Sequence, residues 1–170
     1  MTDMTTEDTQ AQEAKGMLKW LWLSGLVIVL DQITKWMAVD AFQLGERMEI
    51  LPIFNLTMAH NYGAAFSFLA DHGGWQRWFF TAIAVGVSVM LVVWLKRLPK
   101  SDWWMAVALS LILGGAIGNL YDRVTLGYVV DFLDFHWNYK HFPAFNIADS
   151  AITVGAAMMI LDMIRNPGKH

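Results

Sequence analysis

Two long apolar segments without a single charge, 78–95 and 103–121, constrain this chain more than any other feature. A helix that crosses a membrane needs about 20 mostly apolar residues, and both segments approach that length. Two further segments, starting near Met17 and Phe145, are almost as apolar. Hydrophobic residues make up 56% of the chain and charged residues 16%, compared with roughly 45–50% and about 25% in soluble domains. The sequence therefore predicts a membrane protein with four spans.

We expect an all-α membrane protein whose four transmembrane helices form one domain over 17–166. The helices are expected at 17–40, 76–96, 102–121 and 144–164, between polar cytoplasmic tails at 1–16 and 167–170. The acidic start, MTDMTTEDTQAQEA, lacks the basic region of a secretory signal peptide, so we expect the first span to be retained. The alternating stretch 48–61 predicts short strands. We therefore also expect a small extracytoplasmic β-sheet region and a periplasmic loop or helix.

The basic residues predict the orientation of the four helices. Lys and Arg are enriched at the cytoplasmic ends of membrane spans. Basic residues precede the first span, link the second to the third and follow the fourth: Lys15, Lys19, Lys96, Arg97, Lys100, Arg165 and Lys169. Other basic residues dilute this bias: Lys35, Arg47, Arg77, Arg123 and Lys140. We expect both termini in the cytoplasm and the segments 42–76 and 122–144 outside.

Several chemistries lack the residues that they need. The chain has no Cys, which excludes disulfides, thiol nucleophiles and thiolate metal sites. It contains no H-E-x-x-H, no G-x-S-x-G and no Gly-rich phosphate loop, and no basic block predicts binding to nucleic acid. His136 and His141 are five residues apart beside aromatic residues, which favours interfacial side chains over metal ligands. Ser150 has no evident base, which favours a capping or packing role.

Polar residues gather where the predicted helices reach the outer boundary of the membrane. These are Asp31, Lys35, Asn61, Asn119, Asp122, Arg123, Asp131, Asn146 and Asp149. A charge at the centre of a spanning helix costs about 2.5–3.5 kcal/mol on insertion scales, and at the interface it costs less. Any one of these residues is therefore explained better as a solvated helix end. Their number at a single boundary instead indicates a functional site.

The spacing of these residues allows two carboxylates to meet. Asn119 and Arg123 are four apart and Asn146 and Asp149 are three apart, so each pair lies on one helical face. Asp131 lies in the predicted loop that joins these two helices. Two close carboxylates do not both ionise easily, so one keeps a proton while the other acts as a base. Such a pair can activate water for attack on a peptide carbonyl.

Five blocks of the sequence resemble, in order, the signature blocks of the lipoprotein signal peptidases, also called signal peptidase II. The blocks are DQITK (31–35), NYGAAFS (61–67), GGAIGNLYDR (114–123), VVDF (129–132) and FPAFNIADSAI (142–152). The resemblance covers nearly all of the chain except the polar N-terminal tail and the last few residues. A single D-Q-x-T-K or N-x-G block would mean little, whereas five in this order are specific.

The resemblance implies a role for each matching residue. Asp131 and Asp149 match the catalytic dyad of the family. The polar positions that line the family's substrate pocket correspond to Asn61, Asn119, Arg123 and Asn146. Asp31 and Lys35 match a block near the site and would support it through an ion pair or hydrogen bonds, or else contact the substrate directly. Two further carboxylates lie nearby, and we interpret Asp134 as solvated and Asp122 as orienting Arg123 or a helix end.

The family's activity implies an aspartic endopeptidase without a metal or other cofactor. Its substrates are bacterial prolipoproteins modified with diacylglycerol, cleaved just before the lipidated lipobox Cys. The resemblance implies a multi-pass inner-membrane location, an active site at the periplasmic face, contact with membrane lipids, and inhibition by cyclic-peptide antibiotics. We expect a monomer that binds no nucleic acid. The aromatic residues Trp75, Trp78 and Trp137 suit the membrane interface, singly as anchors more than as substrate contacts.

Two other classes of protein use some of the same features. An ion-coupled carrier also places Asp, Asn and Arg in a membrane, but near the bilayer midplane and between related halves, which this sequence lacks. An assembly partner would use Gly114 and Gly118, whose G-x-x-x-G spacing lets helices approach closely. A merely flexible helix explains these glycines nearly as well. The assembly partner explains the small residues but not the converging polar residues.

Overall fold

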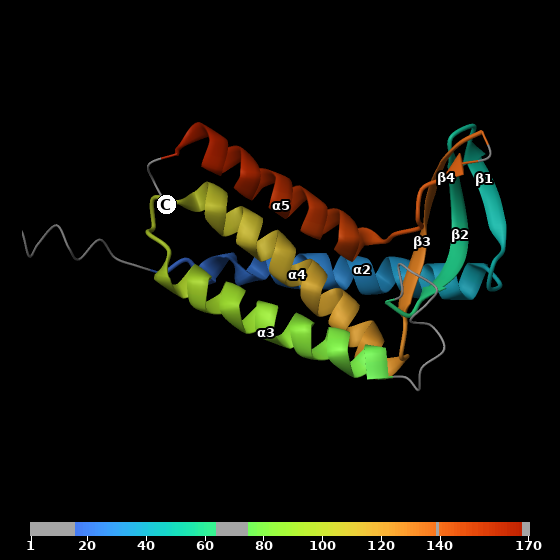
Figure 1. The fold of residues 1–170 in the computed structure, drawn as a ribbon, viewed down its shortest axis with the longest axis horizontal. Coiled ribbons are helices and arrows are strands. Elements are labelled where there is room, and N and C mark those ends of the chain that lie inside the picture. Colours follow the sequence, from blue (N-terminus) through green and yellow to red (C-terminus); the bar gives the residue numbers. More distant parts are fainter. Residues whose placement is uncertain (1–15, 64–74, 139, 168–170) are drawn as a thin grey trace, which may run out of the picture.

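The computed structural model describes residues 16–63, 75–138 and 140–167, in which four long helices meet a small antiparallel sheet at one end (Figure 1). The helices are α2 (Leu21–Ala41), α3 (Trp75–Arg97), α4 (Trp103–Thr125) and α5 (Ile147–Arg165), and a 3-10 turn, η1 (Leu18–Trp20), precedes α2. The strands are β1 (Arg47–Leu51), β2 (Phe54–Asn61), β3 (Val129–Trp137) and β4 (Lys140–His141), in that order across the sheet. All four helices are long and apolar enough to cross a membrane.

Helix α4 is the central helix of the bundle and packs against α2, α3 and α5. Its glycines allow these close contacts. A Cβ atom added at Gly114 would lie 2.7 Å from the Cβ of Val27, and one added at Gly118 would lie 2.7 Å from Oδ2 of Asp31. On the neighbouring face, a Cβ at Gly115 would meet the backbone oxygen of Ala148 in α5. The G-x-x-x-G face thus lies directly against α2, as its spacing predicts.

The apolar side chains of the bundle divide between an internal cluster and an outer surface. Leu95, Met105 and Leu109 are among the buried residues that pack near the end of the bundle opposite the sheet. Helix α3 instead exposes large apolar side chains along its length, including Val89 and Met90. A helix that is apolar all round is suited to contact lipid on its outer side. The interior at the sheet end is occupied largely by polar side chains.

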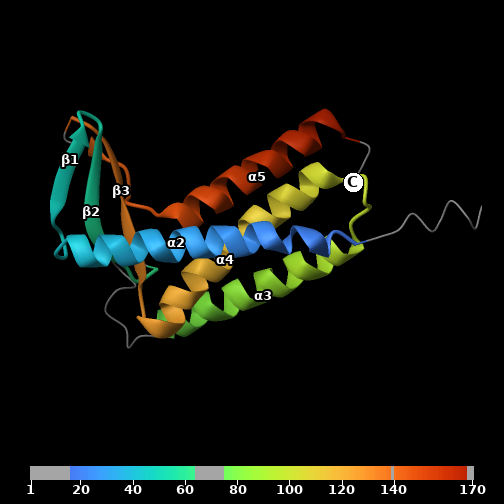
Figure 2. The same ribbon diagram turned by 180° about the vertical axis from the view of Figure 1, so that it is seen from behind.

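The short strands expected over 48–61 are present as β1 and β2, but the prediction that Asp131 lies in a loop is wrong. Residues 129–137 form the strand β3, which pairs antiparallel with β2 and sets Asp131 opposite Ala59 and Asp134 opposite Asn55. Between these two pairs the register shifts at Leu56 to Ala59. Figure 2 shows that α2 reaches this sheet from the bundle. Segments 1–15, 64–74 and 168–170, which include the expected tails and part of the first outer loop, lie outside the described residues.

Two helix ends differ from the sequence prediction in a way that shapes the site. Helix α4 continues to Thr125, four residues beyond the expected end at 121, and so carries Asp122 and Arg123 on helical backbone. Helix α5 begins at Ile147 instead of 144, because Asn146 caps it: the Asn146 side chain accepts from Asp149 N, and the Asp149 carboxylate accepts from Asn146 N. This capping box satisfies two backbone N–H groups that would otherwise lack partners.

Candidate active site

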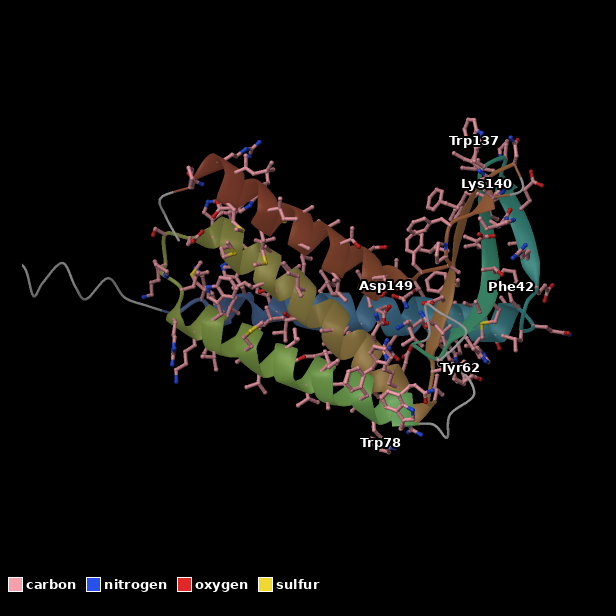
Figure 3. All side chains as sticks on the ribbon, in the orientation of Figure 1. Phe42, Tyr62, Trp78, Trp137, Lys140 and Asp149 are labelled. Atoms are coloured by element: carbon pink, nitrogen blue, oxygen red, sulfur yellow. The ribbon has the colours of Figure 1, made fainter. Side chains whose placement is uncertain are left out.

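The predicted dyad lies where α5 begins beside β3. Figure 3 places Asp149 at the end of α5 that faces the sheet. Asp149 belongs to the first turn of α5, and Asp131 is the third residue of β3. Asp131 is buried, with 2% of its surface exposed, whereas Asp149 is partly exposed. One carboxylate is therefore enclosed by the protein while its neighbour is open to the surroundings.

Asn146 joins the two carboxylates through a single side chain. Its Nδ2 donates to Asp131 Oδ1 at 2.8 Å and to the Val130 carbonyl at 3.1 Å. Its Oδ1 accepts from the backbone N–H of Asp149 at 2.9 Å, and its own N–H donates to Asp149 Oδ2 at 3.3 Å. The side chain is completely buried. Asn146 therefore fixes the position of Asp131 relative to the first turn of α5.

Asn119 provides a second connection, and its amide can adopt only one orientation. Its Oδ1 accepts from the Lys35 ammonium at 3.0 Å and from Asn146 Nδ2 at 3.2 Å. An ammonium group only donates hydrogen bonds, so the amide oxygen must face Lys35 and the amide nitrogen must face away. That nitrogen donates to Asp149 Oδ1 at 2.7 Å. The charge on Lys35 thus determines which atom Asn119 presents to Asp149.

A buried charge network supports these amides from within the bundle. Lys35 Nζ lies 2.8 Å from Asp31 Oδ2 and 2.9 Å from Asp122 Oδ2, and all three side chains are nearly inaccessible. Asp31 also accepts from Ala148 N at 2.9 Å in α5, and Asp122 from Val130 N at 3.1 Å in β3. One helix–helix junction and one helix–strand junction are therefore tied to a single ammonium group. Buried charges are tolerated only when paired and hydrogen-bonded in this way.

Arg123 and Asn61 are the two remaining predicted site residues that interact with the carboxyl groups. The Arg123 guanidinium donates to the Asn119 carbonyl at 3.4 Å and lies 5.6 Å from the centre of the Phe80 ring. Its charge interacts with Asp149, Asp122 and Asp131. Asn61 is exposed and hydrogen-bonds to Asp131. The structure thus brings together all eight residues that the sequence assigns to the site: Asp31, Lys35, Asn61, Asn119, Arg123, Asp131, Asn146 and Asp149.

The environment of Asp131 favours its protonated form. Burial raises the pKa of Asp131 to about 7, and repulsion from the Asp149 carboxylate acts in the same direction. Hydrogen bonds from Asn61 and Asn146 and the charge on Lys35 oppose this rise without cancelling it. Desolvation disfavours a charged carboxyl group, and a nearby like charge adds to that effect. A carboxylic acid and a carboxylate can therefore coexist here near neutral pH.

Both additional carboxylates are buried, and this contradicts the sequence interpretation of Asp134. Asp134 is not solvated: 2% of its surface is exposed, and it binds Asn55 and His141. Side chains alternate between the faces of a strand, so Asp131 and Asp134, three apart, project to opposite faces. Asp122 is also buried and accepts from Lys35 and from Gln32 Nε2, the latter at 2.9 Å. Sequence reasoning missed Gln32, although it lies inside the DQITK block.

His136 and His141 are grouped with Asp134 and not with the predicted dyad. His141 Nδ1 is 2.9 Å from both carboxylate oxygens of Asp134, and the His136 ring stacks on the His141 ring with centroids 5.1 Å apart. Within the described ranges, no three His, Cys, Asp or Glu side chains are grouped as metal ligands. The polar chemistry of the predicted site thus consists of carboxylates, amides, one ammonium and one guanidinium.

Known proteins are similar to this chain in both sequence and fold. A family model described as signal peptidase (SPase) II matches residues 23–165. A Pseudomonas putida protein named lipoprotein signal peptidase is 60% identical over 153 residues, which cover 89% of this chain and 90% of that protein. One of the same name from Pseudomonas syringae pv. tomato is 55% identical over 168 residues, covering 98% and 95%. A solved bacterial membrane enzyme, 32% identical, superposes with a TM-score of 0.79 over 91% of this chain and 93% of its own. The chain therefore belongs to the signal peptidase II family of membrane peptidases.

Proposed function

We propose that this protein is an aspartic endopeptidase that removes the signal peptide from diacylglyceryl-modified prolipoproteins by cutting just before the lipidated Cys. The observation that carries the proposal is the linkage of Asp131 and Asp149 through Asn146 and Asn119. The relatives are named lipoprotein signal peptidases, which supports lipoproteins as the substrate class. No metal or cofactor is needed, because two carboxyl groups and water supply the acid, the base and the nucleophile.

The hydrogen bonds suggest different roles for the two carboxyl groups. Both oxygens of Asp149 accept N–H donors, from Asn119 Nδ2 and from Asn146 N, so we assign Asp149 as the base. Asp131, whose pKa is raised to about 7 by burial and by Asp149, holds the proton. Asp149 takes a proton from water as the water oxygen attacks the scissile carbonyl, and Asp131 donates its proton to the carbonyl oxygen. The tetrahedral intermediate then collapses: its C–N bond breaks as Asp149 gives the proton to the leaving amine. Asp131 takes back a proton from a hydroxyl of the intermediate, which leaves a carboxylic acid as product and restores both carboxyl groups.

The remaining residues would bind and orient the substrate. Asn61 is exposed, Arg123 is partly exposed, and both interact with the carboxyl groups. A guanidinium and an amide suit the carbonyl groups of an extended peptide. Asn119 and Asn146 hold the carboxyl groups in place. Asp31 and Lys35 are completely buried in the network beneath them, which supports a positioning role over direct contact with substrate.

We further propose that the sheet and the dyad face the periplasm from a bacterial inner membrane. The described basic residues of the link between α3 and α4, and Arg165 at the end of α5, lie at the opposite end of the bundle. Such residues mark the cytoplasmic side. Trp78 and Trp137 are exposed near the sheet end, as aromatic residues at a membrane surface are (Figure 3). A lipid-anchored Cys would hold the scissile bond at this depth.

Cleavage of a defined precursor by the purified protein tests the proposal. The protein in detergent is mixed with a prolipoprotein that carries diacylglycerol on its lipobox Cys, with the unmodified precursor as a control. We expect cleavage of the modified precursor alone, with mass spectrometry placing the new N-terminus at the lipidated Cys. Asp131→Asn and Asp149→Asn should each abolish it while leaving the protein folded. Cleavage by both variants would remove the dyad from the mechanism. A cyclic-peptide antibiotic should inhibit the native protein.

A further inference from the structure

A second polar cluster lies on the face of the sheet opposite Asp131 and has no part in the proposed mechanism. Its centre is the buried carboxylate of Asp134. His141 Nδ1 lies 2.9 Å from both oxygens, Asn55 Nδ2 donates to Oδ2 at 3.1 Å, and Arg47 Nε lies 3.8 Å from Oδ2. Asn55 belongs to β2, which pairs with β3, and Arg47 belongs to β1 on the far side of β2. His141 instead ends β4, where the chain turns back toward α5.

The segment that follows His141 delivers Asn146 to the predicted active site. We call residues 142–145 the strap. Its two ends bond to β3: Phe142 N donates to Phe135 O at 2.8 Å, and Phe145 exchanges hydrogen bonds with Leu133 at 2.9 and 3.0 Å. The next residue after the strap is Asn146, whose amide binds Asp131. The position of the strap therefore helps to determine where that amide lies.

The middle of the strap lacks packing on one side. Pro143 and Ala144 line a cavity of about 370 Å³ together with residues of β1 and β2, including Arg47 and Thr57. Asp134 and His141 also line this cavity. Residues that border a cavity lack the packing contacts that neighbouring atoms would provide there. The His141–Asp134 contact and the backbone bonds at the ends of the strap therefore hold it in place.

Asp134 is suited to hold a hydrogen-bond donor firmly. Burial raises the pKa of Asp134, but hydrogen bonds from His141 and Asn55, with the charges of His141 and Arg47, outweigh burial and bring the pKa below its ordinary value. The group is therefore a carboxylate at neutral pH. A hydrogen bond to a charged acceptor is about twice as strong as one between neutral groups.

We propose that Asp134 is a positioning residue for the cleavage reaction: by binding His141 it fixes the strap and thereby holds the Asn146 amide against Asp131. This inference rests on the proposed function, in which Asp131 is part of the dyad. The sequence DFLDF contains two aspartates, and the inference gives a role to Asp134, the one outside the dyad. It also predicts that the two partners of Asp134 differ in importance, because only His141 leads to the strap.

Two substitutions that each remove one partner of the same carboxylate test this difference. His141→Ala cuts the link to the strap, and Asn55→Ala cuts a link within the sheet. A misplacement of about 1 Å at a reacting group costs on the order of 10²-fold in rate. We expect kcat for the modified precursor to fall at least tenfold in His141→Ala, with KM nearly unchanged. In Asn55→Ala, kcat should stay within twofold of the native value. Unfolding temperatures in detergent show whether the two variants are equally destabilised.

A conservative variant separates positioning from bulk structural effects. In His141→Asn, the amide Nδ2 takes the place of the imidazole Nδ1, and we expect it to restore most of the lost kcat. Equal losses of kcat in His141→Ala and Asn55→Ala, or failure of His141→Asn to restore it, would overturn the inference. Full activity of His141→Ala alongside an inactive Asp131→Asn would also overturn it while leaving the proposed function intact. Activity in Asp131→Asn would instead overturn the proposed function.

Discussion

At the scale of single residues, Asn146 combines two tasks that usually fall to different side chains. Its oxygen caps α5, and its nitrogen donates to Asp131, Asn119 and the Val130 carbonyl. Ser and Asp also cap helices well, but neither supplies an amide donor. The helix boundary therefore explains why a capping residue is present, and the carboxylate of Asp131 explains why that residue is Asn.

Substitutions of Asn146 should separate the two tasks. Asn146→Ser keeps a capping oxygen, and Asn146→Ala removes it. Losing a cap costs about 1 kcal/mol, so we expect Asn146→Ser to be the more stable of the two. Both lose the donor to Asp131 and should show at least a hundredfold lower cleavage rate, on the scale of a misplaced reacting group. Thermal unfolding and kinetics with the modified precursor measure these effects. Native-like activity of Asn146→Ser would show that the amide is dispensable.

The raised pKa of Asp131 makes the stability of the folded protein decrease as pH rises. The pKa of Asp131 is about 7 in the folded protein, compared with 3.8 for an ordinary aspartate. Folding therefore favours the protonated form, and this contribution is full below pH 3.8 and lost as pH rises through about 7. Asp131→Asn cannot titrate. We expect the variant to gain stability relative to the native protein between pH 4 and 8, followed as the difference in unfolding temperature in detergent. A difference independent of pH would contradict the raised pKa.

At the scale of helices and strands, close approach of α2 and α4 brings Lys35 to Asn119. Gly118 makes that approach possible, because an added Cβ would lie 2.7 Å from the Asp31 carboxylate. Asp31 in turn lies 2.8 Å from Lys35. The small residue in the helix interface and the buried charge network therefore depend on each other.

Substitution of Gly118 by Ala should therefore be destabilising, against the usual trend. Ala is favoured over Gly by about 1 kcal/mol in an exposed helix. Gly86 in α3 is a matched control, because an added Cβ there meets no atom within 4 Å. We expect Gly86→Ala to keep or raise the unfolding temperature. Gly118→Ala should lower it by several degrees and reduce cleavage. Equal behaviour of the two variants would mean that the interface tolerates the added methyl group.

At the scale of the whole molecule, the fold separates a polar end that carries the sheet from an end rich in basic residues. The link between α3 and α4 lies at the basic end (Figure 1). Trp137 lies at the tip of the sheet (Figure 3). Trp137 is 73% exposed. The proposed orientation requires these two ends to be on opposite sides of the membrane.

The absence of Cys from the sequence makes this orientation easy to test. Trp137→Cys and Lys100→Cys each introduce one thiol, at opposite ends of the bundle. Cells with a permeabilised outer membrane are treated with a maleimide that does not cross the inner membrane. We expect Trp137→Cys to react in these cells and Lys100→Cys to react only after lysis. The reverse pattern would place the sheet in the cytoplasm.

Local sequence patterns determined the four helices of this protein and part of its predicted site. Apolar runs of sufficient length predict the four helices, because burial of backbone in lipid requires continuous helical hydrogen bonding. Helical spacing puts Asn146 beside Asp149, and the capping box confirms that they are close. The predicted spans placed Asp131, Asn61 and Lys35 at the same boundary, and the resemblance to a known family assigned them roles in one site.

Only the tertiary structure decided that the neighbouring carboxyl groups of Asp131 and Asp134 lie in different environments. Asp131 and Asp134 look equivalent in a loop, but pairing of β3 with β2, about 70 residues earlier in the chain, sends them to opposite faces. The same pairing buries Asp134 against Asn55. Lys35, similarly, finds Asp122 only when α2 packs on α4. Hydropathy and helical spacing depend on adjacent residues, whereas strand register and charge pairing depend on segments that meet only after folding.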